Sequence, residues 1–517
     1  MNLFDYFASN VKRYPDKTAL ICQSEAVTYK DLQCCSIRLA GLLWRHGVRK
    51  GSKVAVLLHN SMDFALCMLA AAKLGAVIVP MNPTLPANHV KRAFSHADVE
   101  FVITRTETSI RHENFRDVLP GDKILSIDES LSRNLMQNGG DGQILPTLPY
   151  DVEPECDYLI TMTSGSTSEP KPIVLSQKTK IKRSLEGAKN FYDLSDSEVI
   201  LIGSPMYHSL AFRLTWLPLL IGGTGVILPK FRPVLWLETV QTYGITFTIA
   251  VSSQLGMILD EIKTNSYNLT SLRKIVSSSA ALDAEIKGQL LSKLDCEFHE
   301  CYGTSEIGIA TNLSPQDSAK KLKSVGKPLP YVVLKIVDED DRELPIGNEG
   351  EIVCKTATAF SGYYKKHEVT ERSMRGGYFH TGDMGKLDED GFLYYLGRKD
   401  DVIITGAINV YPRDIEDVLA SFEGIRESAV IGVADSHFGE AILAVIVADK
   451  KIDEKQLRRY CAQYLADYQQ PMAYEFVKEL PKNEMGKIIK RKLKDQFHGY
   501  DATAFLRKIM KGPHENK

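Results

Sequence analysis

The sequence predicts an α/β fold with a large N-terminal domain and a small C-terminal domain of mixed α+β type. Three observations support this prediction. Short apolar strands alternate with helical patterns over the first part of the chain, which is typical of parallel sheets covered by helices. The pattern changes to short strands near residue 328 and changes again near residue 399. A chain of 517 residues is also long enough for two or more domains.

The strands predicted in the first part are short and apolar. "KVAVLL" (53–58) precedes the helical pattern "SMDFALCMLAAAKLG", after which "AVIVPMN" resumes the strand pattern. Further strands are predicted at "CDYLITM", "EVILIG", "GVILP", "TFTIA" and "RKIVSSS". Because a helical crossover between strands brings them side by side in the same direction, this order favours parallel sheets.

The second part of the chain contains two further units. Between residues 328 and 362, acidic and glycine turns separate short strands, which indicates a small β-barrel or meander. A boundary follows near "GRKDDVIITG", and the order after it is helix, two strands, helix and a final helix expected from Lys487. We therefore expect an N-terminal domain at 1–398 and a C-terminal domain at 399–517.

Composition excludes several classes of protein. The chain is 44% hydrophobic and 25% charged with a net charge of −2, so no overall attraction to nucleic acid or anionic membrane is expected. The longest apolar run, 216–229, is too short to span a bilayer, and the N-terminus lacks a signal-peptide pattern. Nine cysteines without a CxxC spacing indicate neither a zinc site nor a disulfide framework, and a reduced cytoplasm is expected.

A turn rich in glycine and hydroxyl groups directly follows the predicted strand "CDYLITM". It reads "TSGSTSEPK" (163–171) and combines backbone N–H groups, hydroxyls and Lys171. Such turns form anion-binding nests, and strand ends are where α/β folds bind ligands. The spacing does not match the P-loop pattern GxxxxGK[ST], which disfavours a P-loop NTPase. Considered alone, the segment is more often a polar surface loop.

Four distant segments carry residues suited to a nucleotide. "ECYGTSEIG" places Glu306 at another strand end, and a carboxylate beside a polyphosphate commonly binds Mg²⁺. Asp383 in "YFHTGD" and Arg398 in "LGRKDD" suit a ribose diol, and Lys487 follows a glycine at an expected helix start. Each residue has an ordinary alternative as a turn residue, surface ion pair or solvated lysine. Their combination in one chain favours a nucleotide site.

The motifs TSGSTSEPK, YGTSE, HTGD, GRKDD and LPKNEMGK resemble those of the ANL superfamily of adenylate-forming enzymes. This superfamily includes acyl- and aryl-CoA synthetases, peptide-synthetase adenylation domains and luciferases. The resemblance extends from about Tyr29 to about Lys494, nearly the whole chain. It implies a large N-terminal domain of two α/β layers plus a small β-barrel, and a small mobile C-terminal domain. It also implies an AMP-forming acyl-CoA ligase that uses ATP, Mg²⁺ and CoA.

The resemblance assigns a role to each motif. The β- and γ-phosphates of ATP would be held by Thr163, Ser164, Gly165, Ser166, Thr167 and Lys171. The rest of the nucleotide site would comprise Tyr302 on adenine, Gly303, Thr304, Ser305 on the α-phosphate, Glu306 as the Mg²⁺ ligand, and Asp383 and Arg398 on the ribose. Lys487 would bridge the substrate carboxylate and the α-phosphate, so Lys487, Glu306 and Lys171 are the implied catalytic residues. Asp400 corresponds to the hinge of the C-terminal domain.

The acid and the thiol are assigned to other segments. The implied acyl pocket contains His208 from "PMYH", Ser278 and Tyr302, and the implied thiol channel contains Gly406 and Ala407 from "GAINVYP". "SSSAAL" (277–282) stands where relatives often have "GGAPL". Serine side chains would narrow the acyl route, which favours a short, medium-chain or aromatic acid, although Ser278 packing on a neighbouring strand is an equal alternative.

The phosphate-binding turn departs from the family pattern. Relatives usually have glycine where Ser168 and Pro172 stand, and histidine where Gln177 stands. Serine is strained wherever glycine had a positive φ, and proline lacks an N–H donor. ATP binding could therefore be weaker here, but the charged residues all remain and an active enzyme is expected.

The chemistry agrees with these residue types. A carboxylate oxygen would attack the α-phosphorus, giving acyl-AMP and pyrophosphate, and a thiol would then attack the acyl carbon. Two anions must meet in the first step, and at ~4 Å their repulsion is about 1 kcal/mol in water and several times larger in a desolvated site. A lysine and Mg²⁺ at the reacting centre offset this repulsion. Rotation of a small domain would supply different groups for the second step.

Two alternative functions stay open. A stand-alone adenylation enzyme would load a carrier-protein phosphopantetheine thiol instead of CoA, and a non-catalytic relative would only bind ATP. The expected partners are a small carboxylic acid, ATP and CoA, with an acyl carrier protein and a homodimer left open, and with no nucleic acid and no membrane span. The identity of the acid is not predicted. Arg213 could pair with a second carboxylate of the acid, but a surface ion pair is favoured about two to one.

Overall fold

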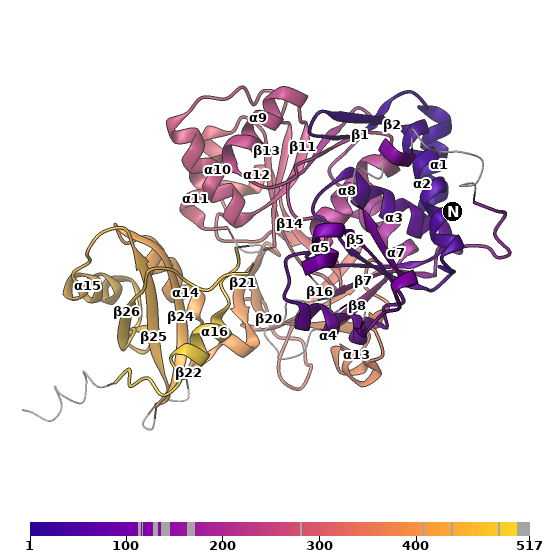
Figure 1. Cartoon of the computed structure of the whole chain (residues 1–517). Coiled ribbons are helices and arrows are strands. Elements are labelled where there is room, and N and C mark those ends of the chain that lie inside the picture. Colours follow the sequence, from indigo (N-terminus) through magenta and orange to yellow (C-terminus); the bar gives the residue numbers. More distant parts are fainter. Residues whose placement is uncertain are drawn as a thin grey trace, which may run out of the picture.

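The protein folds into four β-sheets with helices packed between and around them (Figure 1). The fold is seen in a computed structural model of the whole chain. The residues described are 1–111, 115, 117–127, 133–135, 145–162, 171–279, 282–405, 408–435, 438–483 and 486–503. Two sheets form the body of the N-terminal part, a third is smaller and antiparallel, and the fourth lies in the C-terminal part.

The first sheet has seven strands in the order β18-β8-β7-β4-β3-β5-β6. Its strands are β3 (Lys53–Leu57), β4 (Val77–Pro80), β5 (Phe101–Arg105), β6 (Ile124–Ile127), β7 (Asp157–Met162), β8 (Pro172–Ser176) and β18 (Gly362–Tyr363). Strands β3 to β7 pair in parallel as predicted, whereas β8 and β18 are antiparallel additions at one edge. The sheet is therefore mixed, and the predicted phosphate-binding segment lies in the sequence between the antiparallel strands β7 and β8.

The second sheet has nine strands in the order β15-β14-β13-β12-β11-β9-β10-β1-β2. Its strands are β1 (Thr18–Cys22), β2 (Glu25–Thr28), β9 (Val199–Ile202), β10 (Thr224–Ile227), β11 (Phe247–Val251), β12 (Lys274–Ser278), β13 (Glu297–Thr304), β14 (Gly308–Leu313) and β15 (Lys327–Pro328). The central strands from β1 to β13 run parallel, and antiparallel pairs close both edges.

Helices fill the space between the two sheets and cover their outer faces. They are α1 (Leu3–Arg13), α2 (Tyr29–Arg45), α3 (Met62–Leu74), α4 (Ala87–Ala97), α5 (Thr106–Arg111), α7 (Gln177–Ser184), α8 (Ser209–Ile221), α9 (Pro233–Tyr243), α10 (Ser252–Thr264), α11 (Ala284–Lys293) and α12 (Pro315–Ser318). Helices α3 and α8 are apolar on almost every side and lie in one core that joins both sheets. The Trp216 indole N–H donates to the Tyr158 hydroxyl at 3.1 Å and links α8 to β7.

The predicted small barrel is a five-stranded antiparallel sheet. It contains β16 (Val332–Val337), β17 (Gly350–Thr356), β19 (Met374–Arg375), β20 (Tyr378–Leu387) and β21 (Leu393–Arg398), with α13 (His367–Ser373) beside it. Strand β20 alternates buried and half-buried residues, so Thr381 and Asp383 face inward. A polar residue on the inner face of such a strand needs a partner, and the partners of Asp383 form part of the site below.

The C-terminal part forms its own sheet, and Figure 1 shows it beside β20 and β21. Its elements are β22 (Ile403–Thr405), β23 (Ile408–Val410), α14 (Pro412–Ala420), β24 (Ile425–Asp435), β25 (Gly439–Ala448), α15 (Glu454–Tyr464), β26 (Ala473–Phe476) and α16 (Lys490–Gln496). The final helix begins at Lys490, so the prediction that it begins at Lys487 was wrong. Lys487 lies in the preceding loop, next to a β-bridge between Lys482 and Ile488.

Two predictions from composition can be compared with the described residues. Within them, no helix is both long and apolar enough to cross a membrane. All nine cysteines are described and all are free thiols, and five of them, Cys35, Cys67, Cys301, Cys354 and Cys461, are buried. The cysteines therefore contribute packing and not cross-links.

Candidate active site

Asp383 is the centre of a hydrogen-bonded group that joins the second sheet to the small antiparallel sheet. Its carboxylate is 4% exposed, accepts a hydrogen bond from the Tyr302 hydroxyl at 2.7 Å and pairs with the Arg398 guanidinium at 3.1 Å. Burial raises the pKa of Asp383, and the charge of Arg398 and the bond from Tyr302 oppose that rise. Three residues predicted from separate motifs are therefore in direct contact.

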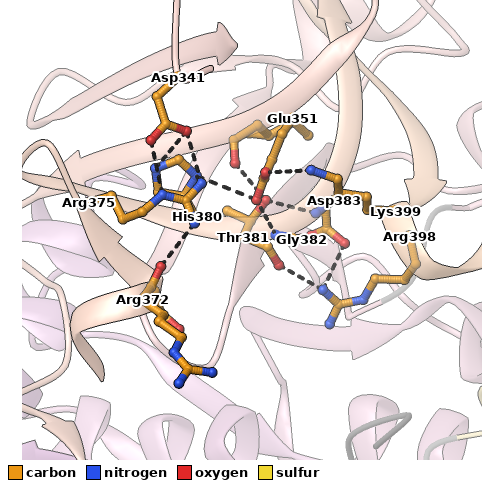
Figure 2. A network of polar contacts seen from close by, with 12 residues as sticks. Asp341, Glu351, Arg372, Arg375, His380, Thr381, Gly382, Asp383, Arg398 and Lys399 are labelled. Carbon is orange, nitrogen blue, oxygen red and sulfur yellow. Dashed lines mark hydrogen bonds and ion pairs between the residues drawn. The ribbon is translucent and has the colours of Figure 1, made fainter. Parts of the chain in front are cut away.

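A second layer of charges holds this group in place (Figure 2). The Glu351 carboxylate accepts a hydrogen bond from the Gly382 N–H at 3.1 Å, and it lies 3.3 Å from the Lys399 ammonium and 3.6 Å from His380 Nδ1. Arg398 also donates to the Thr381 carbonyl at 2.8 Å. No motif indicated Glu351, and Lys399 lies within GRKDD but was assigned no role, because its partner Glu351 is distant in sequence.

Glu306 lies in the turn between β13 and β14 and is half-buried. Its carboxylate accepts a hydrogen bond from the Tyr363 hydroxyl at 2.9 Å, and the Lys171 ammonium lies 5.6 Å from the Tyr363 ring centroid. Tyr363 therefore connects the lysine of the predicted phosphate-binding segment with the predicted metal ligand. The side of the site that would face phosphates thus combines one cation and one carboxylate.

Arg183 on α7 positions the backbone around Glu306, a role that the sequence did not suggest. Its guanidinium is 3% exposed and donates to the carbonyls of Ser305, Glu306 and Thr358 at 3.0, 2.7 and 2.9 Å. Gly308 has a φ of +79°, and a Cβ there would lie 3.1 Å from Arg183 Nε. The glycine of "SEIG" therefore provides both the left-handed turn and the space for this side chain.

The donor set around Glu306 fits Mg²⁺. Among the described residues no group of three or more His, Cys, Asp and Glu side chains could hold a metal ion by itself. Mg²⁺ is usually bound by one or two carboxylates together with substrate phosphates and waters, and not by an all-protein cage. A single half-buried carboxylate beside a cationic phosphate-binding segment has this character.

Lys487 approaches the Asp383 group from the C-terminal part of the chain. Its loop is closed by the Asn483 N–H, which donates to the Lys487 carbonyl at 2.9 Å, and by the Asn483 side-chain oxygen, which accepts from the Lys487 N–H at 2.9 Å. A Cβ on Gly486 would lie 2.6 Å from Ser253 Oγ, so the loop packs closely against α10. The Lys487 side chain keeps contact with solvent, yet desolvation and the Arg398 charge lower its pKa while Asp383 opposes them. The lysine therefore lies within electrostatic range of the predicted ribose-binding pair.

Comparison with known proteins agrees with this geometry. The model of the AMP-binding enzyme family matches residues 7–364, and that of the AMP-binding enzyme C-terminal domain matches residues 414–487. The chain belongs to the AMP-binding enzymes. It is therefore a member of the adenylate-forming superfamily that its motifs resemble.

Full-length relatives of this AMP-binding enzyme include several ligases. It is 31% identical to a long-chain-fatty-acid–CoA ligase of Bacillus subtilis over 94% of its own length and 92% of that protein. It is 30% identical to the fatty acid–[acyl-carrier-protein] ligase ScoC of Streptomyces coeruleorubidus, over 94% and 95% of the two chains. Among solved structures, ATP-bound MatB from Rhodopseudomonas palustris has a TM-score of 0.88, 28% identity and coverage of 96% and 99%.

The phosphate-binding segment of this AMP-binding enzyme is only partly described. Thr163, Ser164, Gly165, Ser166, Thr167 and Ser168 lie outside the described residues. Pro172 lies in β8, where it pairs with Met162, and its carbonyl accepts a hydrogen bond from the Tyr364 N–H at 2.8 Å. Gln177 is fully buried, donates to the Ala72 carbonyl at 3.1 Å and accepts from the Leu3 N–H at 2.8 Å. Gln177 therefore joins three helices of the core.

The predicted acyl-binding residues lie on three neighbouring elements. His208 is the residue before α8, and its ring contacts that of Tyr207 at 4.8 Å. Ser278 at the end of β12 is hydrogen-bonded to the thiol of Cys301, the residue before Tyr302 on β13. Ser279 has a φ of +77°, a left-handed conformation that favours glycine, so the family glycine has been replaced here at a strained position. Ala280 and Ala281 lie outside the described residues.

Arg213 on α8 differs from its prediction. The surface ion pair that the sequence favoured is absent, because the side chain is buried at 7% exposure and forms no ion pair with any residue that the structure describes. Helix α8 is apolar on almost all sides and lies between the two large sheets, so any of its residues past the first turn is buried. The other alternative predicted for Arg213 is a pairing with a second carboxylate of the acid.

The hinge and thiol segments lie where the C-terminal sheet begins. Asp400 is in a single 3₁₀ turn (Lys399–Asp401) directly after β21, and its carbonyl accepts a hydrogen bond from the Lys494 ammonium at 3.2 Å. Gly406 and Ala407 lie outside the described residues, between β22 and β23. The structure thus gives the surroundings of these predicted residues and not their own geometry.

Proposed function

We propose that the residues assembled around Asp383, Glu306 and Lys487 catalyse the formation of an acyl-AMP, which reacts on with a thiol. The protein is an enzyme of the AMP-forming acid–CoA ligase type, and it uses ATP, Mg²⁺ and CoA. The observation that carries the assignment of residues is the approach of Lys487 to the Asp383–Arg398 pair, because it brings a cation of one domain to the nucleotide-binding residues of the other.

In the first step a carboxylate oxygen of the acid attacks the α-phosphorus of ATP. A bond forms between the carboxylate oxygen and the α-phosphorus. The bond from the α-phosphorus to the oxygen of the β-phosphate breaks, and pyrophosphate leaves. Lys487 neutralises part of the charge of the two anions that meet, which stabilises the transition state more than the separated reactants. When bound, Mg²⁺ held by Glu306 would supply charge neutralisation to the phosphates.

The nucleotide is held by residues with distinct tasks. Asp383 and Arg398 bind the two ribose hydroxyls, one as acceptor and one as donor, and Tyr302 fixes the carboxylate and stacks on the adenine. Ser305 contacts the α-phosphate, with Gly303 and Thr304 completing this turn. Lys171 and the segment Thr163 to Thr167 bind the β- and γ-phosphates.

In the second step the CoA thiolate attacks the acyl carbon, the thioester bond forms, and AMP leaves with the oxygen that came from the acid. We propose that domains 1–398 and 399–517 rotate about a hinge at Asp400. Rotation there withdraws Lys487 and brings Gly406 and Ala407 to the acyl carbon. The hydrogen bond of Lys494 to the Asp400 carbonyl is one contact that this rotation would have to break or carry along.

The acid that we propose is short, medium-chain or aromatic, because Ser278 and the strained Ser279 occupy the position where relatives have glycine. Carrier-protein phosphopantetheine is the alternative thiol, and one relative bears such a name. CoA remains the favoured acceptor. We place the reaction in the cytoplasm, where ATP and CoA are supplied and where nine free thiols remain reduced.

A screen of pyrophosphate release over short, medium, dicarboxylic and aromatic acids tests this function. We expect release with at least one class of acid, and formation of AMP and thioester when CoA is added. Release that depends on a carrier protein and not on CoA would favour the alternative acceptor. Binding of ATP without release for any acid would favour a non-catalytic protein and reject the proposal.

A further inference from the structure

Two cationic side chains are buried where α7 packs against α8. Lys180 on α7 is 0% exposed and Arg213 on α8 is 7% exposed. The Lys180 ammonium lies 4.8 Å from the centroid of the Phe212 ring, directly before Arg213 in the sequence. Both helices belong to the core between the two large sheets, so water does not surround either charge.

Neither cation has a polar partner in the part of the chain that the structure describes. Lys180 Nζ and Arg213 Nε are both buried without a hydrogen bond, and no described carboxylate forms an ion pair with either residue. Arg183 lies nearby, but its guanidinium donates to three carbonyls and adds a third positive charge. Burial first, and then the charges of Arg183 and Arg213, hold the pKa of Lys180 well below its usual range.

An unpaired buried charge is costly, and the two side chains respond to it differently. A lysine can lose its proton in such surroundings, which removes the cost. An arginine remains charged at any physiological pH, so Arg213 requires an anion or a set of acceptors. Since the described residues supply neither, the missing partner must come from outside them.

Arg213 lies beside the residues predicted to bind the acid. Burial raises the pKa of the Cys301 thiol, and the hydrogen bond from Ser278 and the charge of Arg213 oppose that rise. Burial likewise raises the pKa of Tyr331 to about 12, again against the charge of Arg213. Cys301 directly precedes Tyr302, and Arg213 follows His208 by little more than one helical turn. The charge of Arg213 therefore acts on residues that adjoin the predicted acyl-binding residues Ser278 and Tyr302.

A π-helical turn (Leu185–Asn190) directly continues α7 beyond these residues. Such turns are rare and occur frequently at functional sites. The Ser184 and Ser277 hydroxyls, on α7 and β12, are also buried without a partner among the described residues. These orphaned groups on the same elements add to the evidence for a polar ligand at this position.

We propose that the acid substrate carries a second carboxylate, which Arg213 binds at the end of the acyl site away from ATP. This inference rests on the proposed function and names its substrate class as dicarboxylic acids. One carboxylate is adenylated, and the other pairs with the Arg213 guanidinium, where Lys180 regains its proton and adds a second donor. A simple fatty acid would leave Arg213 unpaired, and sites built to bind a polar group discriminate strongly against analogues that lack it.

The test compares acids of equal length with one and with two carboxylates. Pyrophosphate release is measured for the series from succinate to suberate, each against the straight-chain monocarboxylic acid with the same number of carbons. We expect a larger kcat/KM for the diacid in the best pair. Arg213→Met should lower the diacid-to-monoacid ratio of kcat/KM by about 30-fold or more, mainly through KM, and Lys180→Met should lower it less.

Arg342→Met is the matched control, because it makes the same chemical change at a side chain that is 75% exposed on a distant turn. It should leave the ratio unchanged. If Arg213→Met does not fold, the wild-type enzyme still decides: the preferred diacid should raise its Tm more than the equal-length monoacid does. A preference for monoacids, or an unchanged ratio in a folded Arg213→Met, would overturn the inference and leave the proposed function standing. Equal stabilisation by chloride, phosphate and diacid would mean that Arg213 binds any anion in a structural role, and it would also overturn the inference. Inactivity with every acid would reject the proposed function itself.

Discussion

Two buried charges of this enzyme, Asp383 and Arg213, have opposite surroundings. Asp383 is paired with Arg398, bonded to Tyr302 and surrounded by the Glu351 network before any ligand binds. Arg213 is buried to a similar extent and has no polar partner among the described residues. The comparison teaches that burial alone does not define a site: a satisfied charge can orient neutral hydroxyls, whereas an unsatisfied one requires a charged ligand.

Arg183 provides the internal reference for this comparison. It is an arginine on the helix next to Arg213, equally buried, and its guanidinium is satisfied by three carbonyls. Arg183 and Arg213 therefore differ in their partners and not in their chemistry. Substitutions of the two should change stability in opposite directions, which allows the comparison to be tested without knowledge of the substrate.

The largest effect is expected for Lys487→Ala, which removes the cation that we propose to act at the reacting centre and whose pKa Asp383 influences. Loss of a preorganised charge at the reacting centre should slow adenylation by about 10³-fold. A synthetic acyl-AMP should still react with CoA at nearly the wild-type rate, because that step uses other groups. Single-turnover kinetics of each half-reaction measure both values. Lys482→Ala, in the same loop but paired with Glu427 on the surface, is the control, and an equal loss of both half-reactions would contradict the assigned role.

The same lysine predicts a pH dependence of the first step. Desolvation, with Arg398, lowers the pKa of Lys487 below the ordinary lysine value. The ammonium form is present below that pKa and lost above it, so adenylation should fall by about tenfold per pH unit once the pH exceeds it. The reaction of a preformed acyl-AMP should lack this alkaline limb. If adenylation by a Lys487→Arg enzyme fell over the same alkaline pH range as in the wild type, a group other than Lys487 would be responsible for the fall.

Arg183→Met should be the more damaging of the two arginine substitutions. It leaves three buried carbonyls without their donor, and we expect the free energy of unfolding to fall by about 3 kcal/mol. The KM for MgATP should rise as well, because the carbonyls belong to the turn that presents Ser305 and Glu306. Urea denaturation and steady-state kinetics measure these effects. An unchanged free energy of unfolding would mean that the hydrogen bonds of Arg183 contribute nothing to stability.

The smallest and opposite effect is expected for Arg213→Met in the absence of any acid. Arg213 is a buried charge with no partner among the residues that the structure describes, so replacing it by an apolar side chain of similar length should raise the free energy of unfolding by about 1 kcal/mol. Saturating diacid should reverse the order by stabilising only the wild type. The same denaturation experiment, with and without acid, measures the change. A marked destabilisation without acid would indicate a protein partner for Arg213 and remove the contrast with Arg183.

The residues that we propose to contact the nucleotide are found from sequence motifs, whereas the residues that support them are not. Short motifs contain Asp383, Arg398, Glu306 and Lys487. The residue types and their order along the chain were therefore sufficient to select them as candidates. Arg183 and Glu351 bind backbone atoms of those motifs from other elements, and no local pattern reveals a partner that is distant in sequence. Their positions follow from the folding of α7 and β17 against the motif turns, which only the structure shows.

Burial explains the predictions that failed. The sequence favoured a surface ion pair for Arg213 because arginine is seldom buried, but the apolar surroundings of α8 place it in the core. The final helix was expected at Lys487 because a basic run begins there, yet the loop closed by Asn483 delays it to Lys490. The alternation of strands and helices predicted the α/β class correctly, whereas the antiparallel edge strands of both large sheets lacked a distinguishing pattern.

Transfer of labelled oxygen from acid to AMP tests the central claim most directly. The enzyme is incubated with ATP, CoA and the preferred acid carrying ¹⁸O in its carboxylate, and AMP is analysed by mass spectrometry. Attack of a carboxylate oxygen on the α-phosphorus predicts AMP that contains one ¹⁸O atom from the acid. Unlabelled AMP, or label recovered in phosphate together with ADP, would contradict the formation of an acyl-AMP at this site.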